Sequence, residues 1–182
     1  MCIRDSLYVM DGNPDDPEGE SWGGSFEPTA RSSRPVFHRL TTAADTVPIY
    51  SIIEFHVKGP DRPDIPADSA CFTLTIGRQE WDGFHLGGGD YAVRHSTYYL
   101  GTLPYTITSD IPGFPALEGA ITIENLWPGR ESATDCKVGP NWYTDKSDPA
   151  LFWRNLQGAE TVYKWRQAVM EDWGKRLQYL KD

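Results

Sequence analysis

The sequence predicts a mainly β protein: an immunoglobulin-like antiparallel β-sandwich, preceded by an irregular segment and followed by a long amphipathic α-helix. Three observations lead to this fold class. Several short runs within 36–125 alternate apolar and polar side chains, the pattern of half-buried strands. The 182 residues include 17 glycines and 14 prolines, which is typical of a loop-rich β protein. Near the end of the chain, apolar residues recur at helical spacing.

The predicted strands follow one another with turn residues between them. In the first strand, Ile53, Phe55 and Val57 share one face, and polar residues occupy the other. The later alternating runs are 72–76, 91–95, 103–107 and 121–123. The sequences GPDRPD, WDGFHLGGGD, SDIPGFP and LWPG are predicted turns that separate or bound these runs. Short strands with one polar face each favour a two-sheet sandwich.

The last third of the chain is predicted to be a connector and a helix. Residues 126–148 are irregular and contain Pro and Gly. Asp148 before Pro149 is a favourable helix start, and a short helix is expected to reach about Leu156. A longer helix is predicted from Ala159 to the end, and such a helix needs a surface that buries its apolar stripe. The stripe consists of Val162, Trp165, Val169, Trp173, Leu177 and Leu180.

The composition restricts the possible partners. The formal net charge is −9, and no block rich in Lys or Arg offsets it, which argues against binding to nucleic acid. No apolar run approaches the length of a membrane span, so no membrane partner is expected. Hydrophobic residues make up 39% and aromatic residues 13%, enough for a core. An acidic surface rich in aromatic rings is compatible with neutral sugars.

The three cysteines, Cys2, Cys71 and Cys136, do not have the spacing of metal ligands. If Cys2 is set aside, a Cys71–Cys136 disulfide is the remaining intramolecular choice, and the sequence cannot test its geometry. Cys71 lies in an apolar alternating run, which favours a buried free thiol. We therefore predict no metal site in this chain.

The acidic stretch DGNPDDPEGESWGGSF, residues 11–26, could be a calcium loop, a phosphate loop or a turn. An EF-hand loop that begins at Asp11 needs Gly at its sixth position and Glu at its twelfth, but Asp16 and Trp22 stand there. Gly23-Gly24 follows a Trp rather than a strand, and no Lys-Ser or Lys-Thr pair follows, which excludes a phosphate loop. A solvated acidic turn is the preferred interpretation. Gly87-Gly88-Gly89-Asp90 is likewise interpreted as a hairpin turn.

No catalytic residue can be assigned. The sequence has no Gly-x-Ser-x-Gly elbow, and its four histidines are isolated or lie on strand positions. Carboxylates are abundant, but a chain with a net charge of −9 is expected to contain many.

The loop aromatics are the better functional indication, because sugar rings stack on exposed aromatic planes. Trp81, with Asp82 beside it as a hydrogen-bond acceptor, is one candidate carbohydrate contact. Trp142 and Tyr143 form the other. The alternative is that these rings seal the ends of the sandwich or the interface with the long helix.

Several segments together resemble a known family. LYVMDGNPDDPEGESWGGSF at 7–26, NWYTD at 141–145 and ETVYKWRQAVMEDWGKRL at 160–177 resemble the closing parts of a nucleoside-hydrolase-like domain. That domain occurs in secreted bacterial proteins often described as "cellulose-binding". VPIYSIIEFHVKGP at 47–60 and GGGDYAVRHSTYYLGTLPYTITSD at 87–110 resemble an immunoglobulin-like module found beside glycoside hydrolase domains.

The resemblance implies a division of the chain and a role for it. Residues 1–6 are interpreted as a foreign N-terminal artefact, 7–35 as the exit from a missing nucleoside-hydrolase-like α/β domain, 36–125 as the sandwich, and 126–182 as connector and helix. The family's calcium-binding aspartate cluster has a different spacing from Asp11, Asp15 and Asp16. The chain is therefore expected to be a non-catalytic fragment of a secreted or periplasmic, carbohydrate-related protein, with calcium bound in the missing domain.

The partners expected on this interpretation are that upstream domain and polysaccharide. The full-length parent would then be a calcium-dependent hydrolase of glycosidic bonds. The alternative interpretation is a stand-alone glycan-binding or structural β-sandwich module.

Overall fold

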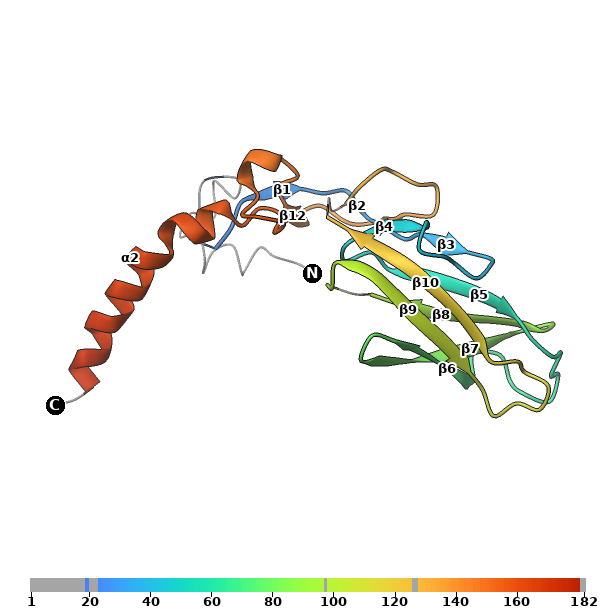
Figure 1. Cartoon of the computed structure of the whole chain (residues 1–182). Helices are drawn as coiled ribbons and strands as arrows, with labels where there is room; N and C mark the ends of the chain where they lie inside the picture. Colours follow the sequence, from blue (N-terminus) through green and yellow to red (C-terminus); the bar gives the residue numbers. More distant parts are fainter. Residues whose placement is uncertain (1–18, 20–22, 97, 126–127, 181–182) are drawn as a thin grey trace. The chain divides into compact units, whose positions relative to one another are not determined.

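A computed structural model describes residues 19, 23–96, 98–125 and 128–180 (Figure 1). The chain divides into two compact units, 31–136 and residues 1–30 together with 137–182. The prediction of a mainly β protein with one long C-terminal helix is confirmed. Most of the stretch 11–26, together with Cys2 and Trp127, lies outside the described residues.

The unit 31–136 is built on one mixed sheet whose strands are hydrogen-bonded in the order β3-β5-β8-β7-β6-β9-β10-β4. Strand β3 is parallel to β5, and β4 is parallel to β10, whereas the other neighbours are antiparallel. The strands are β3 (Val36–Phe37), β4 (Thr46–Pro48), β5 (Ile53–Lys58), β6 (Ala70–Ile76), β7 (Gln79–Gly87), β8 (Asp90–His95), β9 (Gly101–Thr108) and β10 (Leu117–Glu124).

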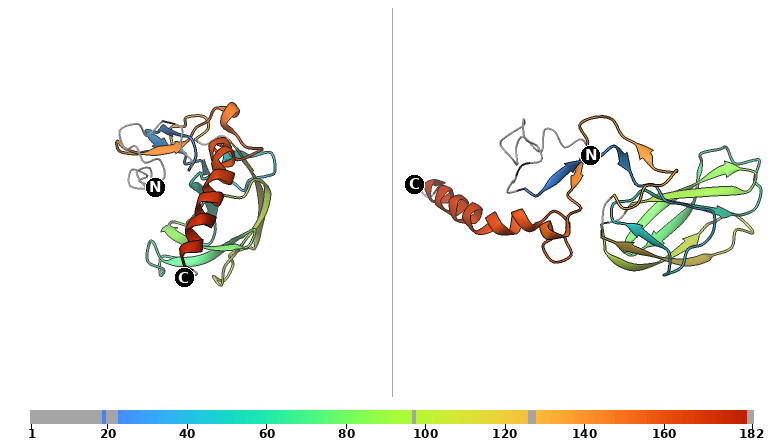
Figure 2. Two further views of the ribbon diagram at one scale, coloured as in Figure 1. Left: turned by 90° about the vertical axis from the view of Figure 1, so that its left-hand side faces the viewer. Right: turned by 90° about the horizontal axis from the view of Figure 1, so that it is seen from above.

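The sheet curls into a half-barrel around its apolar face (Figure 2). Phe55 on β5 and Tyr105 on β9 are four places apart in the strand order, yet their ring centroids are 5.0 Å apart. Phe72 on β6 meets Tyr91 on β8 edge to face at 6.1 Å. The sequence predicted two separate sheets. A continuously hydrogen-bonded, curled sheet is instead present, so an immunoglobulin sandwich is not clearly formed.

The alternation identified in the sequence does select the core. The inward residues of β5, β6, β8, β9 and β10 are buried, and Leu74, Ile107 and Ile121 have no exposed surface. The main members of the core cluster are Val47, Ile49, Ile53, Phe55, Val57, Phe72, Leu74, Ile76, Tyr91, Val93, Tyr105, Ile107, Ile111, Phe114, Ile121 and Ile123.

Three strands of this sheet, β3, β4 and β7, were not predicted from the sequence, and β7 is the longest of them. WDGF was interpreted as part of a turn, but β7 runs through it, and the turn contains only the glycines that follow. Gly83 is the reason for the misleading pattern, because a Cβ atom there would lie 2.0 Å from the ring of Phe72. A glycine inside a strand marks such a close approach. The hairpin at Gly87-Gly88-Gly89 is confirmed, with positive φ at all three residues.

The other unit contains a small ribbon and the helix. Strand β1 (Phe26–Pro28) pairs antiparallel with β12 (Tyr143–Asp145). Asp148 caps a 3-10 turn, η1 (Pro149–Leu151), which is shorter than the helix predicted there. The long helix α2 (Glu160–Leu177) is followed by η2 (Gln178–Leu180). A further two-stranded sheet is formed by β2 (Arg31–Ser32) and β11 (Cys136–Lys137), which lie at the two ends of the segment 31–136.

Helix α2 buries very little among the described residues. Thr161 is its one buried residue, and its hydroxyl is 3.3 Å from that of Ser25. The stripe predicted from the sequence is therefore present as a helix face but is exposed from Val162 to Leu177. No described helix is both long and apolar enough to cross a membrane.

Candidate functional site

A row of oxygen-bearing side chains crosses three neighbouring strands on the outer face of the sheet. Thr73 on β6 is paired with Asp82 on β7 and, on the other side, with Thr108 on β9. The inward neighbours Phe72 and Leu74 are buried, so the sheet's alternation directs Thr73 outward. Because adjacent strands are about 4.8 Å apart, the row spans roughly 10 Å.

A β-bulge ends this row of regular pairing. Ala70 pairs with Phe84, whereas Phe72 pairs with Gly83, so Cys71 is the extra residue. The hydroxyl of Ser109 donates to the Cys71 carbonyl at 2.6 Å and accepts from the Ile111 amide at 3.1 Å. These two bonds tie the loop after β9 to the start of β6.

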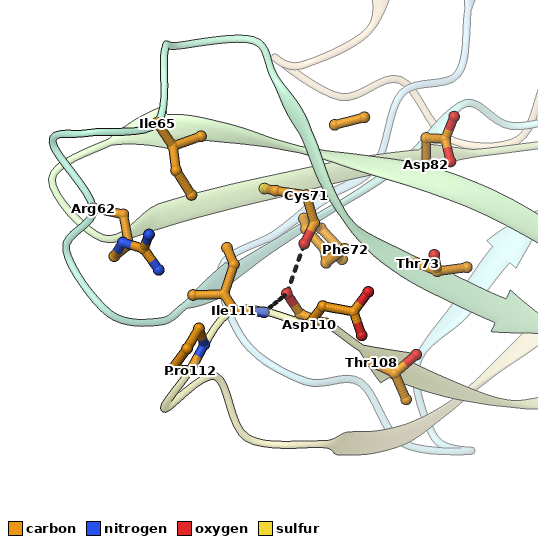
Figure 3. A pocket seen from close by; sticks show the side chains of 12 residues that line it. Arg62, Ile65, Cys71, Phe72, Thr73, Asp82, Thr108, Asp110, Ile111 and Pro112 are labelled. Atoms are coloured by element: carbon orange, nitrogen blue, oxygen red, sulfur yellow. Dashed lines mark hydrogen bonds between the residues drawn. The ribbon is translucent and has the colours of Figure 1, made fainter.

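The row, the bulge and the neighbouring loops enclose an open cleft of about 570 Å³ (Figure 3). Figure 3 shows Asp82, Thr73 and Thr108 on one side and Arg62, Ile65 and Pro112 on the other, with Asp110 between them. The lining residues are Arg62, Ile65, Ala70, Cys71, Phe72, Thr73, Asp82, Thr108, Ser109, Asp110, Ile111 and Pro112. This size is within the range of small-molecule sites.

Some charged side chains of the cleft are already bound to other residues, and some are not. Arg62 binds Asp64 through two hydrogen bonds, at 2.8 Å and 2.6 Å. The hydrogen bond from Arg62 lowers the pKa of Asp64 to about 2. The side chains of Asp82 and Asp110 form no hydrogen bond or ion pair within the described part of the chain. The cleft therefore offers two unengaged carboxylates and two threonine hydroxyls to a ligand.

Burial explains why the thiol of Cys71, beside the cleft, is neutral. Desolvation raises the pKa of Cys71, so its sulfur is held as the neutral thiol. Cys71 and Cys136 are both free cysteines. The cleft is therefore lined by a neutral, partly buried thiol.

Trp81 and Asp82 point to opposite faces of β7. Trp81 packs against the core and meets His95 edge to face at 5.1 Å. Its indole nitrogen is buried and has no hydrogen-bond partner among the described residues. Asp82 is exposed and lines the cleft. This placement of Trp81 favours the sealing role that the sequence left open, whereas Asp82 is placed to act as an acceptor.

Trp142 and Tyr143 belong to the other unit and are partly buried at the start of β12. The Trp142 carbonyl accepts a hydrogen bond from the Thr29 amide at 2.9 Å, and Tyr143 pairs with Pro28. Burial raises the pKa of the nearby Asp145 to about 6. A half-buried ribbon offers less ring surface than the free platform that the sequence suggested.

Sequence reasoning missed Thr73, Thr108 and Asp110. The strings TLT at 73–75 and TIT at 106–108 carried a usable indication, because the threonines alternate with buried residues and must face outward. Their meeting on adjacent strands depends on pairing register, which no local pattern specifies.

A second polar cluster, on β5 and β8, is fully engaged. Glu54 accepts hydrogen bonds from Arg34, Arg94 and His56, with shortest distances of 2.6, 2.7 and 2.7 Å. Burial alone would raise the pKa of Glu54, but these bonds outweigh it and lower the pKa to about 2. A network with every member paired is structural. Within the described ranges, no group of three or more His, Cys, Asp or Glu residues could hold a metal ion.

Comparisons with known proteins add a partial likeness. Part of the chain resembles a crystal structure described as a "putative glycoside hydrolase" from Bacteroides vulgatus ATCC 8482, with a TM-score of 0.38 and 20% identity. The match covers 45% of this chain and 16% of that protein. No known protein family and no curated protein sequence matches the chain. Because the TM-score is below 0.5, the likeness assigns neither a fold nor an activity.

Proposed function

We propose that this chain is a non-catalytic, carbohydrate-binding part of a larger protein, and that saccharide binds in the cleft on β6, β7 and β9. One observation carries the proposal: Asp82, Thr73, Thr108 and Asp110 line an open cleft and are unengaged. Sugar hydroxyls are donors and acceptors at fixed spacing, and such a row of carboxylates and hydroxyls complements them. Ile65 and Pro112 supply apolar surface for the C–H face of a sugar ring.

The length of the row fits more than one sugar. Two strand spacings amount to roughly 10 Å, which is on the order of two linked pyranose rings. The wall formed by the tied 109–112 loop gives this side of the sheet a fixed shape. A small set of placed polar groups beside apolar surface is the usual composition of ligand sites.

Affinity electrophoresis in gels that contain soluble xylan or hydroxyethyl cellulose tests the cleft. The double variant Asp82→Ala/Asp110→Ala is expected to lose retardation, because both acceptors are removed. Its stability should change by less than about 0.5 kcal/mol, since neither carboxylate is engaged. Glu118→Ala is a control, because it removes an exposed carboxylate of the same sheet outside the cleft. Equal retardation of wild type and double variant would refute the site.

We also propose that the parent protein is secreted or periplasmic and contains a nucleoside-hydrolase-like domain upstream of this segment. The support is the sequence resemblance at 7–26 and 160–177, together with the exposed apolar stripe of α2, which such a domain would cover. Calcium would belong to that domain. Purified chain is expected to release no sugar from nucleosides or aryl glycosides. Release of sugar would contradict the non-catalytic assignment.

Strand order supports an immunoglobulin-like origin of the sheet. Divided between β7 and β6, it gives β3-β5-β8-β7 and β6-β9-β10, the two sheets ABED and CFG of a constant-type domain, with β4 added at the edge. On this proposal the β6–β7 hairpin joins the two sheets into one. An experimental structure with a different strand order would contradict it.

The second candidate function is a purely structural module. The inward position of Trp81 and the partial burial of Trp142 and Tyr143 favour it. The absence of retardation by any polysaccharide would leave this candidate as the better one.

A further inference from the structure

A second hollow adjoins the cleft on the outer face of the sheet, over β7 and β8. Its volume is about 440 Å³, and Asp82 lines both this hollow and the cleft. Glu80, Asp82, Phe84 and Leu86 alternate with less exposed residues along β7, so their side chains share the outward face. The second hollow therefore continues the cleft across the next strands of the sheet.

An exposed aromatic ring lines the second hollow beside a small residue. Phe84 is 40% exposed, and its ring makes no aromatic or cation contact within the described part of the chain. Its partner on β8 is Ala92, so the neighbouring strand places no bulky side chain beside the ring. Leu86 is 43% exposed on the same face. The hollow thus contains an apolar aromatic surface of a size that suits one sugar ring.

A guanidinium and a carboxylate line the second hollow from neighbouring strands. Gly83 pairs with Val93, so Asp82 and Arg94, one residue further along, lie opposite each other on β7 and β8. The Nε atom of Arg94 donates to Glu54 at 2.7 Å, which orients the guanidinium. Its two terminal nitrogens have no acceptor within the described residues. A sugar hydroxyl, which is both donor and acceptor, suits this pair of groups.

We propose that the second hollow is an additional subsite of the same saccharide site, in which one further sugar ring stacks on Phe84 and bonds to Asp82 and Arg94. This inference rests on the proposed function of the cleft and extends it, because the ligand becomes a chain of three or more sugar units that crosses the strands from β9 to β8. Three strand spacings amount to roughly 14 Å, on the order of three linked pyranose rings. Asp82 then contacts two successive units.

Charge favours a neutral sugar chain over an acidic one. Asp68, Glu80 and Asp82 line the second hollow, and among the described residues Arg94 is the one cation that lines it. Asp110 adds a carboxylate in the neighbouring cleft. A polysaccharide of uronic acids would bring its own carboxylates close to these groups and would be repelled. The ligand class is therefore a neutral polysaccharide.

Titration calorimetry of the full 182-residue chain with xylo- and cello-oligosaccharides tests the subsite. Wild-type affinity is expected to rise on the order of tenfold from two to four sugar units and then to level off, because the added ring gains a stacking contact. Phe84→Ala should bind the disaccharide like wild type and lose this rise, whereas Phe84→Tyr keeps a ring and should retain it. Tyr98→Ala is the matched control, since it removes an exposed ring of the same unit outside both hollows. Arg94 stays unchanged, because its removal would also take a hydrogen bond from the buried Glu54.

The outcomes distinguish the subsite from the cleft. If affinity does not depend on length, or if Phe84→Ala keeps the rise, the cleft stands and the subsite is wrong. If Phe84→Ala weakens the binding of disaccharide and longer chains equally, the division into two subsites is wrong. If oligogalacturonates bind more tightly than xylo-oligosaccharides of equal length, the ligand is not neutral, and the inference fails. If wild type binds no saccharide, both this inference and the proposed function fail.

Discussion

The two units of the chain are comparably aromatic but treat their apolar side chains in opposite ways. In 31–136, the curled sheet brings β5 against β9, and residues such as Leu74 and Ile107 have no exposed surface. In α2, Trp165, Val169 and Trp173 are each more than one third exposed within the described structure. The curled sheet buries its apolar side chains against one another, whereas the helix would need another surface to cover its stripe.

A hydrophobic pattern identifies the apolar face of an element but not the surface that buries it. The periodic patterns predicted an apolar face for the strands and for the helix, and both faces are present. They did not predict which surface covers each face. For the sheet, strand pairing supplies the cover, because each added strand extends a curved layer that closes over its own inner face. A single helix has no equivalent mechanism, and its packing depends on what lies beside it.

The largest expected effect comes from removing a tryptophan of the sheet. Trp81→Ala should destabilise the unit 31–136 by about 3 kcal/mol, because the indole packs against the core and against His95. Urea unfolding monitored by circular dichroism measures this loss. If unfolding were unchanged while polysaccharide binding disappeared, Trp81 would be the stacking platform first suggested by the sequence. Asp82→Ala, on the opposite face of β7, is the control.

Much of the fold follows from local pattern, and the misses have physical reasons. Five strands and the long helix were predicted, because their alternation and stripe reflect burial directly. Strand β7 was missed because Gly83 is a packing requirement of Phe72, although it looks like a turn residue. The short ribbons β1–β12 and β2–β11 depend on pairing between distant segments.

The candidate site was predicted less well than the fold. Asp82 was identified, but Trp81 beside it points into the core, because successive side chains along a strand point to opposite faces of the sheet. Thr73 and Thr108 are 35 positions apart and become neighbours through register.

Lowering the pH from 7 to 5 should reduce the free energy of unfolding of the unit 31–136 by about 2 kcal/mol. Burial lowers the pKa of His95 from 6.5 to about 4, so the unfolded chain binds a proton more readily than the folded sheet. Stability of 31–136 is therefore full above pH 6.5 and is lost as the pH falls toward 4, by about 2 kcal/mol at pH 5. Urea unfolding at pH 7 and pH 5 measures the difference.

The other unit should respond to acid with the opposite sign. Burial raises the pKa of Asp145 from 3.8 to about 6, so its folded form keeps a proton that the unfolded form has released. This contribution is present below pH 3.8 and is lost as the pH rises through 6.

The control for the pH dependence of the unit 31–136 is the variant His95→Phe, which should flatten that dependence. An equally steep dependence in that variant would show that His95 is not its source.

The smallest expected effect is on the helix. Trp173 is 55% exposed, and Trp173→Ala should leave unfolding of the chain within about 0.5 kcal/mol of wild type. A slight gain is expected, because Ala has a higher helix propensity than Trp. Thermal unfolding followed by circular dichroism at 222 nm measures it, with Trp81→Ala as the matched substitution on a covered face. A loss comparable with that of Trp81→Ala would show that the stripe of α2 is already covered in this chain. The contrast between a sheet that covers its own apolar face and a helix that does not would then fail.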